Sequence, residues 1–282
     1  MTFSAAAKTV SSAQSQASGS SFYSAMRLLP KPERSAMFAI YAFCREVDDI
    51  ADEVGPTPEE RRAQLDVWRR AVESLFTGGA TARVRDLAGP VRQYGLAKAD
   101  FLAVIDGMEM DVAEPIRRPP FTTFDLYCDR VASAVGRLSV KVFGMADEPG
   151  KELAHHLGRA LQFTNILRDL DEDADMGRLY LPDEALTAAG ITSDDPLEVL
   201  DHPALDKACR WLAAKAHEHY QAANAVLAKR PAGRLRAPRL MSAVYRAILK
   251  RMEKKGWGAP RERVSLGKGD LAWILATRGL RR

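Results

Sequence analysis

Two acid-rich segments, far apart in the chain, both lie where apolar residues recur with the period of an α-helix. The first covers residues 48–52, Asp-Asp-Ile-Ala-Asp, and the second covers residues 165–175. Residues four apart lie on one face of a helix, with Cβ atoms about 5–6 Å apart. Asp48 and Asp52 therefore pair, while Asn165, Asp169 and Asp173 form a ladder of three oxygens. Two such helical walls, facing each other, suit Mg²⁺ and a diphosphate.

The second segment carries an electrostatic cost that a bound cation would offset. Five of the seven residues 169–175 are acidic, and they approach a helix end marked by Gly177. The macrodipole disfavours negative charge at that end, and Asp is an indifferent helix former. Mg²⁺ prefers hard oxygen ligands and takes its remaining ligands from water and phosphate. A carboxylate-rich cleft is thus expected to bind Mg²⁺ together with a polyphosphate.

The alternative is that the acids form a solvated charge run, which is the commoner meaning of such a segment. Apolar stripes beside both clusters argue against it, because they place the acids along packed helices. In the first helix the predicted core stripe is Ile40, Phe43, Val47, Ile50 and Val54, next to Tyr41, Arg45, Asp48 and Asp52. In the second it is Phe163, Ile166, Leu167 and Leu170, next to Gln162, Asn165 and Asp169.

Helical periodicity extends over nearly the whole chain, and strand-like alternation is almost absent. The fold class predicted is all-α, a bundle whose facing helices surround a central apolar cavity. We expect one domain, residues 18–282, preceded by a disordered Ser- and Ala-rich tail at 1–17 that lacks the apolar core of a signal peptide. The predicted helices are 32–54, 58–76, 80–94, 97–113, 122–143, 149–173, 204–227, 237–255 and 270–278.

Composition is that of a core-forming protein rather than of a membrane or nucleic-acid-binding one. The chain has 282 residues, of which 46% are hydrophobic, and no apolar run is long enough for a transmembrane helix. Its net charge of +4 is too dispersed to indicate nucleic acid, although it suits anionic small molecules or an anionic membrane surface. The three cysteines lack metal-ligand spacing and are expected to be buried free thiols in a reducing cytoplasm.

Other chemistries leave no signature. The chain has no GxSxG elbow, P-loop or HExxH helix, and residues 267–269 lack the rest of a dinucleotide fingerprint. Histidines 155 and 156 are adjacent, and histidines 217 and 219 are two apart, so each pair splays to different helix faces. The sequence therefore assigns the histidines no role.

Several long motifs resemble the head-to-head prenyl synthases, the squalene and phytoene synthase family. The first is Ser21-Phe22-Tyr23 with Leu29-Pro30 and the run Ala39-Ile-Tyr-Ala-Phe-Cys-Arg-Glu-Val-Asp-Asp-Ile-Ala-Asp52. The second is Gln162-Phe-Thr-Asn-Ile-Leu-Arg-Asp169 with Asp173, followed by Gly177-Arg-Leu-Tyr-Leu-Pro182. The resemblance covers roughly residues 18 to 268.

The resemblance implies an isoprenoid-synthase fold and assigns roles to individual residues. The implied Mg²⁺ ligands are Asp48, Asp52, Asn165, Asp169 and Asp173, with Asp49 less clearly placed because it lies one residue off the inward stripe. The implied substrate-binding residues are Ser21, Phe22, Arg45, Gln162, Asn165, Arg168 and Arg178, the arginines neutralising diphosphate oxygens. Tyr41 and Tyr127 are implied pocket tyrosines that steer a cation or relay a proton, with ordinary core packing as the alternative.

The resemblance further implies head-to-head condensation of two farnesyl diphosphates to presqualene diphosphate, with release of diphosphate. Phytoene synthases usually carry an aromatic residue where Asp129 stands and glycine where Ser133 stands, so the chain is more similar to the bacterial members of hopanoid biosynthesis. NADPH is not expected, although a reductive squalene synthase stays open. Two alternatives from other classes also remain: a chain-elongating prenyltransferase or terpene cyclase, and a non-catalytic helical scaffold.

We expect a cytoplasmic protein with peripheral contact to the inner face of the membrane. The segment Leu271-Ala-Trp-Ile-Leu275, with Arg278, Arg281 and Arg282, has the composition of a short interfacial helix. The alternative is a terminal helix that packs on the body of the protein. Prenyl chain length, oligomeric state and a downstream pathway enzyme are not specified by the sequence.

Overall fold

The computed structural model describes residues 26–27 and 29–279. The tail predicted at 1–17, and Ser21 and Phe22, lie outside these residues. Within them the chain is helical, and the β-structure consists of one isolated bridge between Arg117 and Leu179. The all-α fold class is confirmed. None of the described helices is long and apolar enough to cross a membrane.

The helices follow in chain order, with short 3₁₀ and π turns between some of them. They are α3 (Lys31–Asp52), α4 (Pro58–Phe76), the 3₁₀ turn η1 (Ala82–Val84), α5 (Arg85–Tyr94), α6 (Lys98–Ala113), α7 (Phe121–Cys128), the π turn η2 (Asp129–Ser133), α8 (Ala134–Val142), α9 (Asp147–Arg168), α10 (Leu170–Asp175), α11 (Asp183–Ala189), α12 (Pro196–Asp201), α13 (Leu205–Ala228), α14 (Arg236–Lys255), α15 (Lys268–Ile274) and the π turn η3 (Leu275–Gly279).

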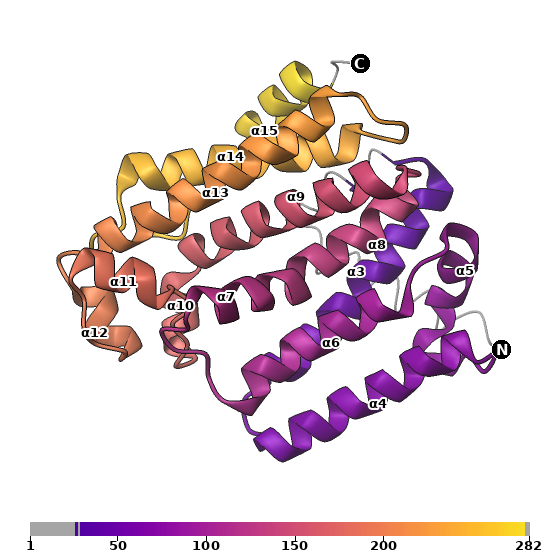
Figure 1. The fold of residues 1–282 in the computed structure, drawn as a ribbon, viewed down its shortest axis with the longest axis horizontal. Coiled ribbons are helices and arrows are strands. Elements are labelled where there is room, and N and C mark those ends of the chain that lie inside the picture. Colours follow the sequence, from indigo (N-terminus) through magenta and orange to yellow (C-terminus); the bar gives the residue numbers. More distant parts are fainter. Residues whose placement is uncertain (1–25, 28, 280–282) are drawn as a thin grey trace.

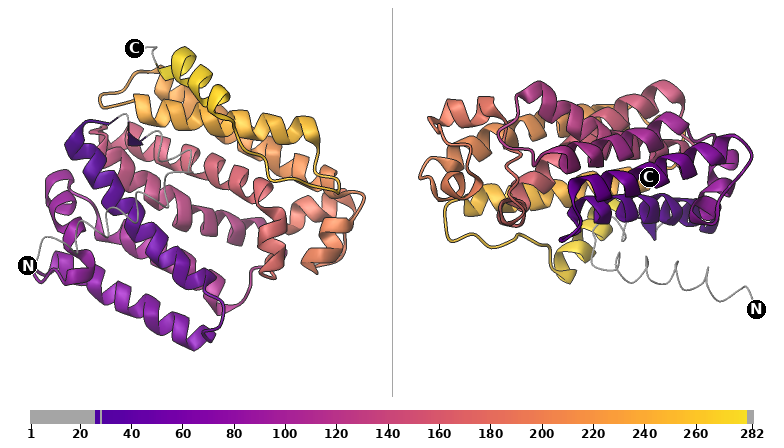
Figure 2. Two further views of the ribbon diagram at one scale, coloured as in Figure 1. Left: turned by 180° about the vertical axis from the view of Figure 1, so that it is seen from behind. Right: turned by 90° about the horizontal axis from the view of Figure 1, so that it is seen from below.

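Helix α9 runs through the middle of the bundle. It packs against α13 on one side and α8 on the other, and α14 also contacts it (Figure 1). Helices α3, α4 and α6 pack together on the side away from α13. The short helices α10, α11 and α12 gather near the C-terminal end of α9, an arrangement also seen from behind (Figure 2). The first acid-rich segment thus ends the long helix α3, and the second runs from the end of the long helix α9 into the short helix α10.

The first acid-rich helix ends earlier than predicted. Four of the five residues predicted for its core stripe are buried, but Val54 is 95% exposed. The chain leaves the helix at Glu53, whose backbone is extended, and then passes through Gly55 at φ +116° and Pro56. A glycine in this region and a following proline both favour termination. The prediction for Val54 was therefore wrong.

The second acid-rich helix, predicted as unbroken over 149–173, is interrupted at Asp169. Its backbone, at φ −105° and ψ 22°, separates α9 from α10. The indole Nε1 of Trp257 donates to the carbonyl of Leu167 at 2.9 Å, just before the break. The amides of Asp169 and Asp173 nevertheless donate to the carbonyls of Asn165 and Asp169, each at 2.9 Å. The four-residue spacing of the oxygen ladder thus survives the change in backbone angles.

Two further helices were not predicted, and one predicted helix contains a π turn. Helices α11 and α12 have seven and six residues, shorter than the window over which periodicity is readable. Helix α12 begins at the N-cap Asp195, whose carboxylate accepts from two backbone amides at 3.0 Å. The segment predicted at 122–143 consists of α7, η2 and α8, and π turns within helices often occur at functional sites.

Helix α9 approaches η2 closely at Gly158. A Cβ added there would lie 2.7 Å from the Cα of Ser133 and 2.8 Å from its backbone nitrogen. Because these are backbone atoms, a side-chain rotation does not relieve the contact. Glycine at position 158 is therefore required by the packing of α9 on η2, although it costs helix propensity.

Gly158→Ala is expected to lower the free energy of unfolding by about 1–3 kcal/mol, the usual cost of overpacking. The matched control is Gly89→Ala, in the exposed interior of α5, where an added Cβ meets nothing within 4 Å. Because Gly89 precedes Pro90, whose ring disfavours helical backbone for a residue with a Cβ, the gain in helix propensity is partly offset, and stability should change by less than about 1 kcal/mol. Urea denaturation of both variants measures the effects, and stabilisation by Gly158→Ala would contradict the packing argument.

Candidate active site

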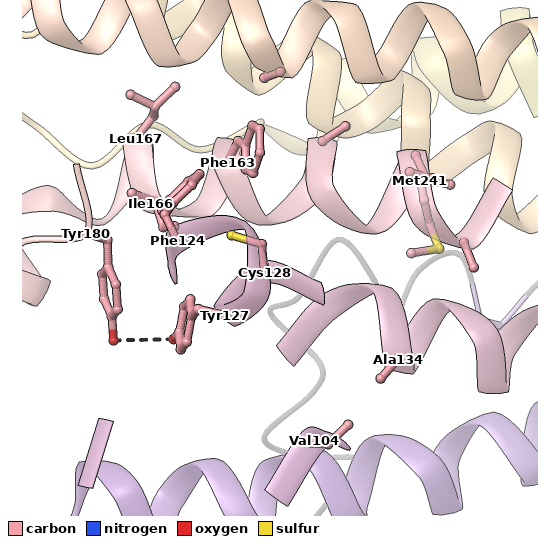
Figure 3. Close-up of a cluster of buried hydrophobic side chains, with 14 of the residues drawn as sticks. Val104, Phe124, Tyr127, Cys128, Ala134, Phe163, Ile166, Leu167, Tyr180 and Met241 are labelled. Carbon is pink, nitrogen blue, oxygen red and sulfur yellow. Dashed lines mark hydrogen bonds between the residues drawn. The ribbon is translucent and has the colours of Figure 1, made fainter. Parts of the chain in front are cut away.

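A cavity of about 550 Å³ lies between the helices that carry the two acid clusters. Along α9 its lining changes character: Leu153, Leu157 and Leu161 line it first, followed by Gln162 and Asn165. On α3 the same change runs from Ile40 and Tyr41 to the acids. Helix α6, α8, η2 and α14 complete the apolar walls, among them Val104 and Met241 (Figure 3). The cavity is thus apolar along most of its length and acidic where α3 and α9 end.

The predicted site residues that the structure describes converge on this cavity. Those that line it are Tyr41, Arg45, Asp48, Asp52, Tyr127, Gln162, Asn165, Arg168, Asp169, Asp173 and Arg178. Ser21 and Phe22 lie outside the described residues. Asp49 does not line the cavity; its carboxylate is half exposed and pairs with Arg45. The sequence placed Asp49 less clearly among the Mg²⁺ ligands, and in the structure it lies on the side of α3 that faces away from the cavity.

Arg178 joins the ends of the two acidic walls. Its Nη1 lies 2.7 Å from Oδ1 of Asp52, and its Nη2 donates to the carbonyl of Ala51 at 3.1 Å. The Arg178 side chain is almost completely buried, whereas that of Asp52 is 39% exposed, so only the guanidinium side of the pair is shielded from solvent. It follows Gly177, whose φ of +73° suits glycine at the turn after α10. This link fixes the C-terminal end of α3 against the segment that follows α10.

Other arginines flank the acids. Nη1 of Arg45 lies 2.6 Å from Oδ2 of Asp48. Arg168 forms a two-point contact with Asp169 at 2.7 and 2.6 Å. Nε of Arg263 lies 2.9 Å from Asp169 and also 2.9 Å from Glu172. Guanidinium groups keep their charge and present paired donors, so they suit the oxygens of a diphosphate as well as carboxylates.

The carboxylates of this site are strained electrostatically. Burial, with the nearby charge of Asp52, raises the pKa of Asp48 to about 7. Burial, with the charge of Asp169, raises the pKa of Asp173 to about 8. Like charges held close together in a partly dry cleft disfavour ionisation. A divalent cation placed among them would favour the ionised forms.

A hydrogen-bonded series of three buried groups lies beside the acids, and sequence reasoning assigned a role only to its first member, Tyr127. The hydroxyl of Tyr127 donates to that of Tyr180 at 3.3 Å (Figure 3). Tyr180 in turn donates to Asp111 at 2.7 Å. The two rings stack with centroids 4.9 Å apart. Burial raises the pKa of Asp111, which is 6% exposed. The available signal was an acid on the apolar face of α6, among Val104, Met108 and Val112.

The donor set fits a hard divalent cation. Oδ1 of Asn165 is buried and has no hydrogen-bond partner among the described residues, although it lines the cavity. A buried amide oxygen without a donor is costly unless a cation or water meets it. Together with Asp48, Asp52, Asp169 and Asp173 it supplies the all-oxygen ligand set that Mg²⁺ prefers.

Comparison with known proteins places this geometry in one family. Residues 15–270, nearly the whole chain, match squalene/phytoene synthase. The chain belongs to the squalene/phytoene synthase family. A relative from Zymomonas mobilis, named presqualene diphosphate synthase, is 54% identical over 93% of this chain and 89% of its own length. A second of that name, from Rhodopseudomonas palustris, is 52% identical over 93% and 94%.

Solved structures agree with this assignment. A dehydrosqualene synthase in complex with a ligand has a TM-score of 0.81 and 25% identity, over 95% of this chain and 94% of its own. A squalene synthase from Alicyclobacillus acidocaldarius has a TM-score of 0.78 and 26% identity, over 89% and 95%. The expected isoprenoid-synthase fold is therefore confirmed.

The two positions at which the sequence was expected to depart from phytoene synthases, Asp129 and Ser133, both contact one buried arginine, Arg159. Nη1 of Arg159 lies 3.0 Å from Oδ1 of Asp129 and 2.9 Å from the hydroxyl of Ser133. The same guanidinium forms a two-point contact with Asp125 at 2.7 and 2.9 Å. Arg159 is 4% exposed, so each of these partners offsets the cost of burying its charge. Asp129 and Ser133 thus belong to one hydrogen-bond network between η2 and α9.

The raised pKa of Asp173 predicts a pH dependence of stability. A folded-state pKa above the unfolded value means that the folded protein binds the proton more tightly, so stability falls as pH rises from about 4 to about 8. In chelator, Asp173→Asn should flatten this decline and raise stability at pH 8 by about 1–2 kcal/mol, allowing for solvent screening. Urea denaturation between pH 5 and 8 measures it. Asp175→Asn, an exposed change on the same helix, is the control, and equal slopes in all three proteins would contradict the prediction.

Proposed function

We propose that this chain is a presqualene diphosphate synthase, which condenses two farnesyl diphosphates head-to-head and releases one diphosphate. The observation that carries the proposal is the cavity, apolar along α9 and closed by two acid clusters with arginines among them. Relatives that are 52–54% identical over about nine-tenths of both chains bear this name, which supports the choice of product. The two acid clusters serve the diphosphate, and the apolar length serves the prenyl chains.

Mg²⁺ is the cofactor proposed, held by Asp48 and Asp52 from one wall and by Asn165, Asp169 and Asp173 from the other. When bound, it stabilises the negative charge that develops on the leaving diphosphate. Arg45, Arg168 and Arg178 bind the diphosphate oxygens from the rim of the same cluster. NADPH is not part of the proposed reaction.

The reaction balances without an oxidant or reductant. The C1–O bond of one substrate breaks, and its electron pair leaves with the diphosphate to give an allylic cation. The double bond of the second substrate attacks that cation, and loss of one proton closes the cyclopropane of presqualene diphosphate. Apolar walls such as Val131 and Leu157 exclude the water that would quench the cation. Tyr41 lines the same space and presents a ring face that stabilises positive charge.

The chain from Tyr127 through Tyr180 to Asp111 is proposed to manage the proton. Tyr127 lines the cavity just before η2, and its hydroxyl is the first donor of this hydrogen-bond series. Asp111 lies at the other end with a raised pKa, so its carboxylate is suited to hold a proton. The relay would pass a proton away from the hydrocarbon without admitting bulk water.

Peripheral membrane contact is proposed for the C-terminal helix. Ile274 on α15 is buried, so this helix packs on the body of the protein. This is the alternative to a purely interfacial helix that was stated from the sequence. Trp273, next to it, is 67% exposed. An exposed indole at the protein surface suits the membrane interface, where the oily product would dissolve.

Mass spectrometry of the lipids formed from farnesyl diphosphate and Mg²⁺, with and without NADPH, tests the proposed activity. We expect presqualene diphosphate in both conditions. Squalene formed when NADPH is added would assign the chain to the reductive members of the family. No product from farnesyl diphosphate would contradict the proposal and direct the search to longer substrates.

Asp48→Asn and Asp169→Asn are each expected to lower turnover by two to three orders of magnitude or more, about the effect of removing one group that stabilises developing charge. Diphosphate release measures it, with circular dichroism to verify the fold. Asp49→Asn is the matched control, because Asp49 is adjacent to Asp48 but does not line the cavity. Retained turnover in the first two variants would contradict the assigned roles.

A farnesyl diphosphate analogue that resists ionisation, added with Mg²⁺, should raise the melting temperature by several degrees. At ligand concentrations near 100 times Kd the stabilisation is about 2.7 kcal/mol. For a chain of this size that corresponds to roughly 5–10 °C. Either component alone should give much less, since each completes the site of the other. A non-catalytic scaffold would show no such joint effect.

A further inference from the structure

Three histidines that the sequence left without a role come together between α9 and α13, and none of them lines the cavity. His155 and His156 lie on α9, and His219 lies on α13. One ring nitrogen from each lies within 4.8 Å of the other two. In the sequence, each pair of histidines was judged by its spacing within one helix. That spacing does not decide whether they meet, because His219 reaches His155 and His156 from a neighbouring helix. We propose that these three imidazoles bind a divalent transition-metal ion of the Zn²⁺ type.

The geometry of two of the ligands is close to that of a metal site. Nδ1 of His156 lies 3.0 Å from Nδ1 of His219. Two nitrogens that are each 2.0–2.1 Å from a tetrahedral Zn²⁺ lie about 3.3–3.4 Å apart. The two nitrogens therefore need to move apart by only a few tenths of an ångström to bind the ion between them. Phe163 packs edge-on against His219 with centroids 5.4 Å apart, which holds that ring in place.

The third ligand, His155, is exposed and has room to turn. Its Nδ1 lies 2.9 Å from Nη1 of Arg159. On metal binding, His155 would give up this contact and bind the ion instead. Arg159 keeps Asp125, Asp129 and Ser133 as partners, so its buried charge stays compensated. The repulsion between this guanidinium and a cation is offset by the same two carboxylates.

The imidazoles are suited to metal binding because they are neutral. Partial desolvation, with the neighbouring Arg159, lowers the pKa of all three, and for His219 the value falls to about 4. A neutral imidazole offers a lone pair without first releasing a proton. Glu152, one turn before His156 on α9, lines the same surface depression as His155 and His156, and water would supply the fourth ligand. Zinc is commonly bound by three protein ligands, with water in the fourth position.

The ligand type separates this site from the acidic cavity. Imidazole nitrogens favour Zn²⁺, Co²⁺, Ni²⁺ and Cu²⁺, whereas the oxygens of the cavity favour Mg²⁺. The ion would join the middle of α9 to α13, the pair of helices at the centre of the bundle (Figure 1). Its expected role is therefore to stabilise the helix that carries Asn165, independently of substrate.

Titration of tag-free protein with Zn²⁺ by calorimetry, and with Co²⁺ by visible absorption, tests the site in the presence of excess Mg²⁺. We expect one Zn²⁺ per chain, visible Co²⁺ bands of a four-coordinate site, and a rise in melting temperature with Zn²⁺. In His156→Gln/His219→Gln the affinity should fall by more than the roughly 10–100-fold that outer-shell changes cause. Zn²⁺ affinity equal to that of the wild type in this variant would overturn the proposal.

Matched variants locate the ion and guard against misfolding. His217→Gln is the control on α13, because Nε2 of His217 lies 2.9 Å from Glu253 instead of facing the cluster, and it should bind Zn²⁺ normally. Asp48→Asn/Asp169→Asn should also bind normally, and loss of binding there would place the ion in the acidic cavity and overturn the proposal. If the double histidine variant fails to fold in chelator, exposed His155→Ala gives the second test: it should lose the four-coordinate Co²⁺ bands, and keeping them would overturn the assignment.

Discussion

Holding several carboxylates together at the end of an apolar cavity is the constraint on which this structure depends. Burial and mutual repulsion raise the pKa values of Asp48 and Asp173 far above that of an exposed Asp. Arg178 offsets part of this repulsion from a buried position, and it does so by bridging to Asp52 on the opposite wall. The same ion pair therefore lowers the electrostatic cost and fixes the relative position of the two acidic helices.

The neighbouring structure serves this end of the cavity. The segment between α14 and α15, residues 256–267, folds back past the C-terminal end of α9. Trp257 donates to the carbonyl of Leu167, Arg261 pairs with Asp171 at 2.7 Å, and Arg263 pairs with Asp169. The break at Asp169 leaves helix carbonyls without helical partners, and this segment supplies one of the donors. A distant part of the chain thus completes the acidic wall.

Much of the site could be predicted from the sequence because helical spacing is local. A residue and its neighbour four positions on share a face whatever surrounds the helix, so the pair Asp48 and Asp52 and the ladder through Asn165 follow from the chain alone. The ladder survives even the break at Asp169, because the backbone hydrogen bonds on either side are kept. The helix ends were less predictable: Val54 continues the apolar period, yet Gly55 and Pro56 end the helix before it is buried.

The sequence by itself determined the all-α class, the family motifs and most of the side chains that line the cavity, since these rest on spacing within single helices. The tertiary structure decided which helices face one another. It brought Asp111 and Tyr180 to Tyr127 and Arg263 to Asp169, and it joined His219 to His155 and His156. Each of these contacts joins segments that are remote in the chain, and their packing follows from the shapes of buried surfaces, which no local period encodes.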